Sequence, residues 1–277
     1  MYMGLKIMIR NICNELRKNL YIPVYLISSV LVTVVCSLSI GFESSNGIRY
    51  SVAEIVLFAD KELIISNGEL DRYSIWYNGL SGYGTILFPL LIGIGFMYVI
   101  SAERKNGTNR FMLIRSNSLK YCVSKTVAAV LSSGIILLTG YVLYGIIVYL
   151  KFPAPVDFEE LYGMGEIQAV LIRLLRTFGY GGYISVIPIS VSMFFNDRYI
   201  LMCLPLIVKY VIDQSALKLL ITSTTMSSIV NTFSMERIIM DPEGFSFVNM
   251  AFYIGLLVLI TIAMKIIVKG RDGYGLD

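Results

Sequence analysis

The sequence predicts an all-α integral membrane protein with six transmembrane helices. Hydrophobic residues make up 56% of its 277 positions and charged residues only 15%, an apolar balance that soluble domains of this length rarely have. Six apolar stretches approach the roughly 20 residues that a helix needs to cross the hydrocarbon core of a bilayer. Lysine and arginine are also concentrated in every second loop, as the topology of a multi-pass membrane protein requires. We interpret residues 1–277 as one transmembrane domain.

The six stretches are expected to be closed helices, because hydrocarbon offers unpaired backbone N–H and C=O groups no partners. Their expected bounds are 22–42, 83–101, 127–149, 178–195, 199–220 and 247–268. Between the last two stretches, residues 214–244 are rich in Ser, Thr and Met and have a broken apolar pattern. This segment is expected to lie outside the membrane, or to dip back into it as two short half-helices.

Orientation follows from the charged residues, since cytoplasmic loops carry the excess of Lys and Arg. Basic residues gather before the first stretch, between the second and the third, and around the end of the sixth: Lys6, Arg10, Arg17, Lys18, Arg104, Lys105, Arg110, Arg115, Lys120, Lys125, Lys265, Lys269 and Arg271. The alternate loops are mainly acidic. Both termini are therefore expected in the cytoplasm. The richness in Ile, Lys, Asn and Tyr points to a low-GC bacterium, and so to a bacterial cell membrane.

Residues 1–21 are predicted to form an amphipathic helix that lies in the surface of the inner leaflet. Its apolar residues recur at helical spacing, and its basic residues occupy the rest of the helical wheel. The apolar set is Leu5, Met8, Ile9, Ile12, Leu16 and Leu20. Two roles stay open at this point: a plain anchor that enforces topology, or a mechanical part of gating.

The loop 43–82 is expected outside the cell, and it is long for a connection between two spans. One short helix is predicted within it by the apolar positions Val52, Ile55, Val56, Ala59 and Leu63. Such a loop forms a lid, recognises cargo, or packs as a cap over the helix ends.

Charged residues in or near the apolar stretches give two further expectations. Lys209 and Asp213 stand four positions apart in the fifth stretch, and therefore on one face of a helix. Charges at such depth are costly and usually pair while facing the bundle interior or water, so the pair is either a polar patch on a transport path or a self-neutralising structural pair. Arg173 and Arg176 are expected to snorkel at the outer interface, with the binding of an acidic cargo group as the alternative.

No pattern indicates catalysis within this chain. Positions 79–82 read Gly-Leu-Ser-Gly, the short serine motif of one class of membrane protease, but that chemistry requires a histidine base and the chain contains no histidine. Histidine-based metal sites are excluded for the same reason. The four cysteines show neither a disulfide framework nor metal-ligand spacing.

Energy from ATP would have to enter through another chain, because the sequence lacks the phosphate-binding pattern Gly-x-x-x-x-Gly-Lys-Ser/Thr. No cofactor is expected in this chain. The net charge of +4 is explained by basic cytoplasmic loops, so no nucleic-acid partner is expected either.

The most specific motif is the basic loop between the second and third stretches, residues 103–120. It reads Glu-Arg-Lys-Asn-Gly-Thr over 103–108, and Lys-Tyr-Cys-Val-Ser-Lys follows over 120–125. At this place in the topology, the pattern resembles the permeases of type-2 ATP-binding-cassette (ABC) exporters. The family pattern there is Glu, basic residues, Gly-Thr, an apolar pair, a serine-containing turn, and an aromatic residue with Ser/Gly-Lys leading into span three. Many members have a proline in the turn where this chain has Arg-Ser-Asn-Ser over 115–118.

This resemblance implies that residues 103–120 form a coupling helix that docks into a cleft of a cytoplasmic ATPase subunit. The residues carried over are Glu103, Arg104, Lys105, Gly107, Thr108 and Phe111, with Lys125 at the return to the membrane. Gly107 permits a tight break, and Thr108 can cap a following helix. The alternative is that the basic residues only enforce topology and bind anionic lipid.

The resemblance further implies two permeases, identical or homologous, facing each other across a lumen lined mainly by spans one, two and five. ATP and Mg²⁺ would then be bound by the partner ATPase, and Lys209 and Asp213 would lie near the path. The expected cargo is an amphipathic antimicrobial peptide, such as a bacteriocin or toxin that is exported or cleared from the membrane in immunity, followed by lipid-linked glycans and small drugs. The alternatives are a secondary transporter, a channel, or a structural or regulatory membrane subunit.

Overall fold

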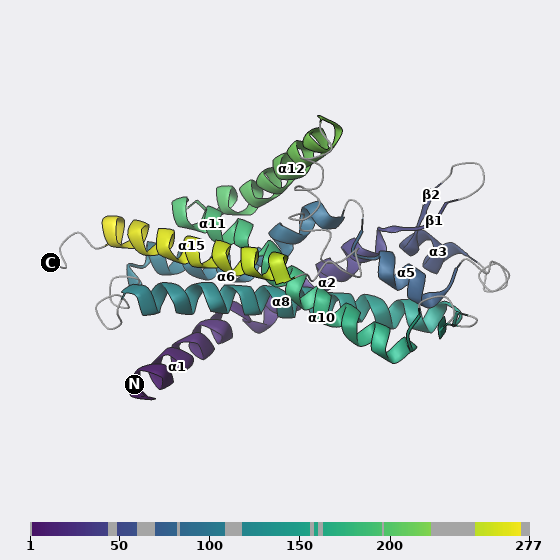
Figure 1. Ribbon diagram of the computed structural model, residues 1–277, viewed down its shortest axis with the longest axis horizontal. Helices are drawn as coiled ribbons and strands as arrows, with labels where there is room; N and C mark the ends of the chain where they lie inside the picture. Colours follow the sequence, from purple (N-terminus) through teal and green to yellow (C-terminus); the bar gives the residue numbers. More distant parts are fainter. Residues whose placement is uncertain are drawn as a thin grey trace.

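The computed structural model describes residues 2–43, 49–59, 70–81, 84–108, 118–155, 158–159, 163–195, 197–222 and 247–272. Helices α6 (Gly84–Lys105) and α8 (Ser118–Lys151) run along its long axis (Figure 1). Helix α1 (Tyr2–Asn19) begins and helix α15 (Phe247–Asp272) ends at one end of this axis. The opposite end holds strands β1 (Ile40–Glu43) and β2 (Arg49–Ser51) and helices α3 (Val52–Phe58) and α5 (Arg72–Asn78).

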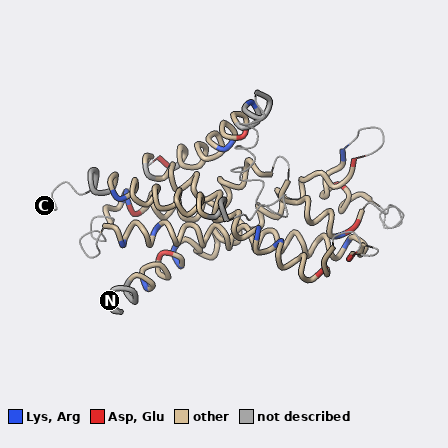
Figure 2. Tube along the Cα trace, viewed as in Figure 1, with Lys and Arg blue, Asp and Glu red and all other residues tan. Residues whose placement is uncertain are grey.

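Three helices in the described part of the chain are long and apolar enough to cross a membrane: Gly84–Lys105, Ser118–Lys151 and Glu166–Ser192. The last of these joins α10 (Glu166–Ile184) to most of α11 (Val186–Phe194). A fourth candidate is the pair Met8–Asn19 and Ile22–Ser37, bent by 66°, if that pair is one span. Figure 2 shows the middle of α6 and α8 in tan, and positions 84–102 and 126–150 contain no Asp, Glu, Lys or Arg. The described part of the chain thus has an all-α fold with one small β-hairpin, and its candidate spans are those of a multi-pass membrane protein.

The break between α1 (Tyr2–Asn19) and α2 (Ile22–Ser37) lies where the sequence predicts the interfacial helix to end. Pro23 stands in the first turn of α2. In a continuous helix its ring would clash with the carbonyl four residues earlier, that of Asn19. The chain therefore bends here, and α1 leaves the line of α2.

The predicted end of the first span at residue 42 is wrong. Helix α2 ends at Ser37, and the chain then forms β1, which pairs antiparallel with β2. A short apolar run fits a strand as well as the last turn of a helix, so the sequence of residues 38–42 does not decide between them. The partner strand, with Phe42 opposite Tyr50, supplies the backbone hydrogen bonds that make the segment extended.

Helix α3 confirms that the loop 43–82 contains a short helix, which ends at Phe58 before the predicted position Leu63. It begins with a capping box: Ser51 Oγ accepts the Glu54 N–H at 3.3 Å, and Glu54 Oε2 accepts the Ser51 N–H at 2.7 Å. The hydrogen bond from the Ser51 backbone, followed by that from its hydroxyl, lowers the pKa of the Glu54 carboxyl. Sequence analysis did not predict the hairpin or α5.

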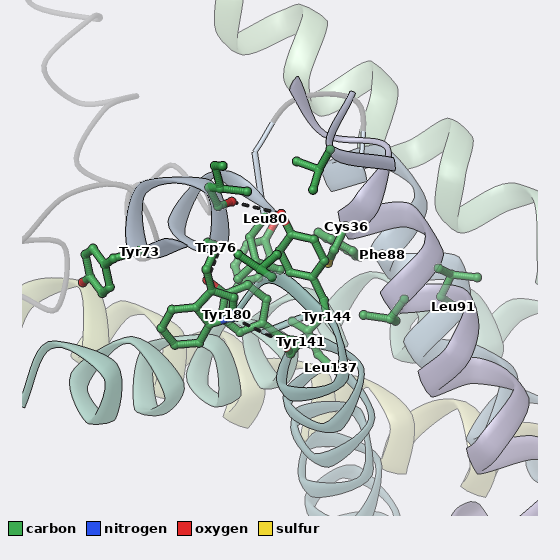
Figure 3. Close-up of a cluster of buried hydrophobic side chains, with 14 of the residues drawn as sticks. Cys36, Tyr73, Trp76, Leu80, Phe88, Leu91, Leu137, Tyr141, Tyr144 and Tyr180 are labelled. Carbon is green, nitrogen blue, oxygen red and sulfur yellow. Dashed lines mark hydrogen bonds between the residues drawn. The ribbon is translucent and has the colours of Figure 1, made fainter. Parts of the chain in front are cut away.

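Helix α5 packs as a cap on α8 through aromatic side chains (Figure 3). The Trp76 ring stacks on Tyr141 with 4.8 Å between ring centroids. The Tyr141 hydroxyl donates to the Trp76 carbonyl at 2.8 Å, and the Tyr144 hydroxyl donates to the Ile75 carbonyl at 2.9 Å. These buried hydroxyls satisfy backbone groups that a short helix leaves open, so the cap interpretation of the loop fits its described part.

Two helices begin well before their predicted spans. Helix α8 begins at Ser118 rather than 127, and α10 begins at Glu166 rather than 178 before meeting α11 at Ser185. The apolar pattern detects only the part of a helix that hydrocarbon surrounds, whereas the backbone continues its hydrogen bonding through polar residues. The apolar pattern therefore underestimates the length of both helices.

The fifth and sixth apolar stretches correspond to α12 (Arg198–Thr222) and α15 (Phe247–Asp272). Helix α12 packs against α6 and α11, and its far end leans away from the rest of the bundle (Figure 1). Residues 214–222 of the segment expected to form half-helices continue α12 instead. Residues 223–246 lie outside the described residues.

Small residues let α8 approach its neighbours closely, a usual device of membrane helices. A Cβ atom at Gly140 of α8 would lie 2.6 Å from Val32 Cβ and 2.7 Å from the Ser29 carbonyl oxygen of α2. A Cβ atom at Gly181 of α10 would lie 2.9 Å from the Ser133 carbonyl oxygen of α8. Glycine is therefore required where α8 crosses both helices.

The variant Gly140→Ala is expected to destabilise the protein by about 1–3 kcal/mol, the usual cost of overpacking, because the new methyl group meets the backbone of α2. Gly255→Ala is the matched control, since no atom lies within 4 Å of the position its Cβ would take, and alanine favours a helix over glycine. Thermal unfolding in detergent, followed by circular dichroism, measures both variants. Equal unfolding midpoints would contradict the close contact of α2 with α8.

Candidate functional site

Four charged side chains form one ion cluster where α1, α6 and α8 meet. Lys18 Nζ of α1 lies 2.9 Å from Oε1 of Glu15 and 2.9 Å from Oε1 of Glu103 in α6. Lys125 Nζ of α8 pairs with the Oε2 atoms of the same two carboxylates. Each carboxylate therefore contacts both amines, and three helices are joined by a network of two acids and two bases.

Most of the ion cluster is out of contact with water. The Lys125 side chain is 3% exposed and Glu15 is 5% exposed, whereas Glu103 is 12% and Lys18 is 41% exposed. Lys125 Nζ also lies 5.7 Å from the centroid of the Tyr121 ring. Removing one partner of a buried ion pair costs about 3–5 kcal/mol. The cluster thus fixes the amphipathic helix α1 to the two helix ends that flank the basic loop.

Two adjacent basic residues at the end of α6 have different surroundings. Arg104 Nη1 donates to the carbonyl oxygens of Ser192 and, at 3.3 Å, of Phe195, at the end of α11. Lys105, the next residue, is exposed. One base therefore holds α6 to α11, while the other faces solvent.

The break expected at Gly107 is confirmed, because its φ is +67°, a value that glycine adopts most readily. The Thr108 hydroxyl donates a hydrogen bond of 3.2 Å to the carbonyl of Glu103. This hydrogen bond holds Thr108 against the end of α6. Phe111 and the rest of 109–117 lie outside the described residues. The structure brings Glu103 and Lys125 together, and the role of these motif residues in ATPase coupling stays a prediction.

Lys125→Met is expected to lower the free energy of unfolding by about 3–5 kcal/mol, since it removes the buried amine and leaves Glu15 and Glu103 with only the amine of Lys18, whose side chain is 41% exposed. Lys105→Met makes the same change at an exposed position and is expected to stay within about 0.5 kcal/mol of the parent. Unfolding in detergent measures both. Adding Glu103→Gln to Lys125→Met should recover much of the loss, and a double variant no more stable than Lys125→Met would contradict the cluster.

The ion pair expected in the fifth apolar stretch is present in α12. Lys209 Nζ pairs with Asp213 Oδ1, one helical turn further on. The Lys209 side chain is 1% exposed and Asp213 is 25% exposed, so the amine is covered by the bundle while the carboxylate reaches its surface. A place for this pair on a transport path stays a prediction.

Either single reversal, Lys209→Asp or Asp213→Lys, puts two like charges one turn apart and is expected to cost about 3–5 kcal/mol. The exchange of both residues restores opposite charges and should recover most of that loss. Thermal melting and the yield of monodisperse protein in detergent provide the measurement. An exchange variant as unstable as the single variants would show that the charges do not stabilise each other.

Arg173 was expected at the membrane surface, and this prediction is wrong. Its side chain is 2% exposed, and its guanidinium carbon lies 3.8 Å from the centroid of the Tyr77 ring. Nη2 donates to the Tyr77 carbonyl at 2.6 Å, and Nε donates to the Tyr141 hydroxyl at 3.2 Å. Loop 43–82 supplies the carbonyl and the ring face of Tyr77, and α8 supplies the Tyr141 hydroxyl. No local hydropathy measure reveals these distant partners. Arg176, one turn further on, is half-buried.

Sequence reasoning also missed Glu15, which completes the ion cluster. It is the one acid in α1, and it stands three positions before Lys18, with which it pairs. The signal in the sequence was a single acid among the basic residues of an amphipathic helix. A helix that only sets topology needs basic residues and no acid.

Comparison of the sequence with models of known protein families and with curated protein sequences finds no match. The functional interpretation therefore depends on the motif of the basic loop and on the geometry of the helix ends around it.

Proposed function

We propose that this protein is the permease subunit of an ATP-driven type-2 ABC exporter in a bacterial cell membrane. In this proposal the chain crosses the membrane six times with both termini in the cytoplasm, and two permeases, identical or homologous, enclose the path. Separate cytoplasmic ATPase subunits bind ATP and Mg²⁺ and dock on the basic loop. The motif over 103–125 supports this proposal. The start of α1 and the end of α15, which lie at the same end of the bundle (Figure 1), support it as well.

The ion cluster is the observation that carries the proposal. Both helix ends that frame the basic loop are bound to α1 through the ion cluster. A subunit that displaces the loop would move α1, α6 and α8 together, since breaking a buried pair costs about 3–5 kcal/mol. A loop that only enforced topology would gain nothing from burying Glu103 and Lys125 against each other. The arrangement therefore favours a mechanical role for α1 over a plain anchor.

The surfaces of α2 and α12 support an amphipathic or hydrophobic cargo. Both helices expose many large apolar side chains, including Ile27 and Val30 of α2 and Ile207 and Val211 of α12. In the proposed assembly these helices line much of the path, which suits an antimicrobial peptide better than ions or free sugars. Export of a bacteriocin or toxin, or its clearance from the membrane in immunity, is the first candidate. Lipid-linked glycans and small drugs follow.

The proposal is tested by purifying the tagged protein in mild detergent from its native host and measuring co-purified ATPase by mass spectrometry. Lys105→Glu, which reverses an exposed charge beside the loop, is expected to reduce ATPase retention about tenfold, because a like-charge contact at an interface costs more than 1.4 kcal/mol. Arg49→Glu makes the same reversal on the exposed hairpin and should retain the ATPase fully.

Equal loss in the two variants would contradict docking on the basic loop. A protein that purifies without any ATPase, yet still moves substrate in proteoliposomes without ATP, would overturn the proposal in favour of a secondary transporter or channel. A protein that binds the ATPase but gives no cargo-stimulated turnover would instead be a structural or regulatory subunit.

A further inference from the structure

Helix α1 presents four exposed side chains on the side that faces away from the bundle. Ile9, Cys13 and Arg17 follow one another at four-residue spacing and therefore form one ridge along the helix. Arg10 stands beside this ridge, about two turns before Arg17, and shares its face. All four residues are exposed, Ile9 to 52%. These four residues are the exposed face of α1.

The other side of α1 belongs to the bundle. Glu15 and Asn19, four residues apart, are 4% and 3% exposed, and α1 packs against α8 and α6. Glu15 and Lys18 are members of the ion cluster. Neither Arg10 nor Arg17 has an ion-pair partner among the described residues. Both guanidinium groups are therefore available to a ligand outside the chain.

The exposed face is positively charged. Glu15 is the single acid of α1, and its side chain is enclosed in the ion cluster with 5% exposure. The two arginines are thus not neutralised by their own helix. Guanidinium groups bind phosphate oxygens through two parallel hydrogen bonds, so the exposed face suits a surface that presents phosphate.

The apolar residue on the same ridge favours lipid as the partner. A lipid surface offers acyl chains to Ile9 and phosphate groups to Arg10 and Arg17 side by side, as it does for other interfacial helices with a basic polar face. The direction of α1 agrees with this contact, because α1 is bent by 66° from α2. Beside a spanning α2, such a helix lies closer to the plane of the membrane than to its normal.

We propose that the exposed face of α1 binds the phosphate head groups of anionic lipids at the membrane surface. The bound lipid holds α1 in place, and Glu15 and Lys18 on the other side of the helix carry this restraint to the ion cluster. The charge of the membrane thereby regulates how firmly α1 is attached to α6 and α8. This inference is independent of the proposed exporter function, because it requires neither an ATPase nor a cargo.

The chain offers a natural probe position within the exposed face. Of its four cysteines, Cys13 and Cys203 are exposed, whereas Cys36 and Cys122 are buried. In a Cys203→Ser background, a nitroxide spin label therefore reacts with Cys13. The labelled full-length protein is reconstituted into vesicles of phosphatidylcholine alone, or of equal parts phosphatidylcholine and phosphatidylglycerol. Electron paramagnetic resonance then measures the access of a neutral, water-soluble nickel complex to the label.

Phosphatidylglycerol is expected to raise the ratio of membrane-seated to water-exposed label, by about fivefold for each arginine, the effect of one basic residue near an anionic surface. The double variant Arg10→Gln/Arg17→Gln should lose this response, and Arg10→Lys/Arg17→Lys should keep most of it. Added salt should weaken the response in the parent, because it screens exposed charges. Arg49→Gln, which removes a charge from the hairpin, is the matched control and should respond as the parent does.

The unlabelled protein provides a second measurement. In neutral maltoside detergent, short-chain phosphatidylglycerol should raise its unfolding midpoint more than phosphatidylcholine of the same chain length. This difference should vanish in Arg10→Gln/Arg17→Gln, whose circular dichroism in detergent establishes that it is folded.

Equal label access in the two kinds of vesicle would overturn the proposal. A folded Arg10→Gln/Arg17→Gln variant that responds to phosphatidylglycerol as the parent does would overturn it as well. A label that stays water-exposed in both kinds of vesicle, and is protected only when a co-purified protein is present, would reassign the exposed face to a protein partner.

Discussion

The burial of three cations, and the need to compensate each of them inside the bundle, governs the arrangement of the described chain. Lys125, Arg173 and Lys209 are each at most 4% exposed. An uncompensated charge in such surroundings costs several kcal/mol. Two carboxylates neutralise Lys125, one neutralises Lys209, and Arg173 binds a carbonyl, a hydroxyl and a ring face. Helix α1 supplies Glu15 and helix α5 supplies Tyr77, so the positions of these two helices are tied to the buried cations.

Helix α8 connects the two ends of the molecule. Near its start it holds the ion cluster through Lys125, and near its far end Tyr141 and Tyr144 hold the α5 cap. Between these points it crosses α2 and α10 at glycine contacts that leave no space for adjustment. A displacement of the helix at the loop would therefore be carried to the cap by a rigid element, which is a physical route for coupling. In the proposed exporter, this route joins the ATPase side to the α5 cap.

The exposed apolar surface is as informative as the buried charges. Large side chains such as Ile22 and Leu26 of α2 and Tyr210 of α12 are at least half exposed, which is costly for a protein in water. Lipid covers such surface in a membrane, and in the proposed assembly the second permease covers part of it.

The sequence by itself determined the features that depend on local chemistry. Long apolar runs form helices in hydrocarbon, because a helix pairs the backbone N–H and C=O groups within the segment. The i, i+4 spacing of Lys209 and Asp213 brings these two side chains together on any helix. Tertiary structure alone decided where Arg173 points, because its acceptor, the Tyr77 carbonyl, lies 96 positions away along the chain. The same holds for Glu103, whose partner Lys18 is 85 positions away, and for β1, which needed β2. Hydropathy is a property of a short window, whereas the compensation of a buried charge depends on which distant segment folds against it.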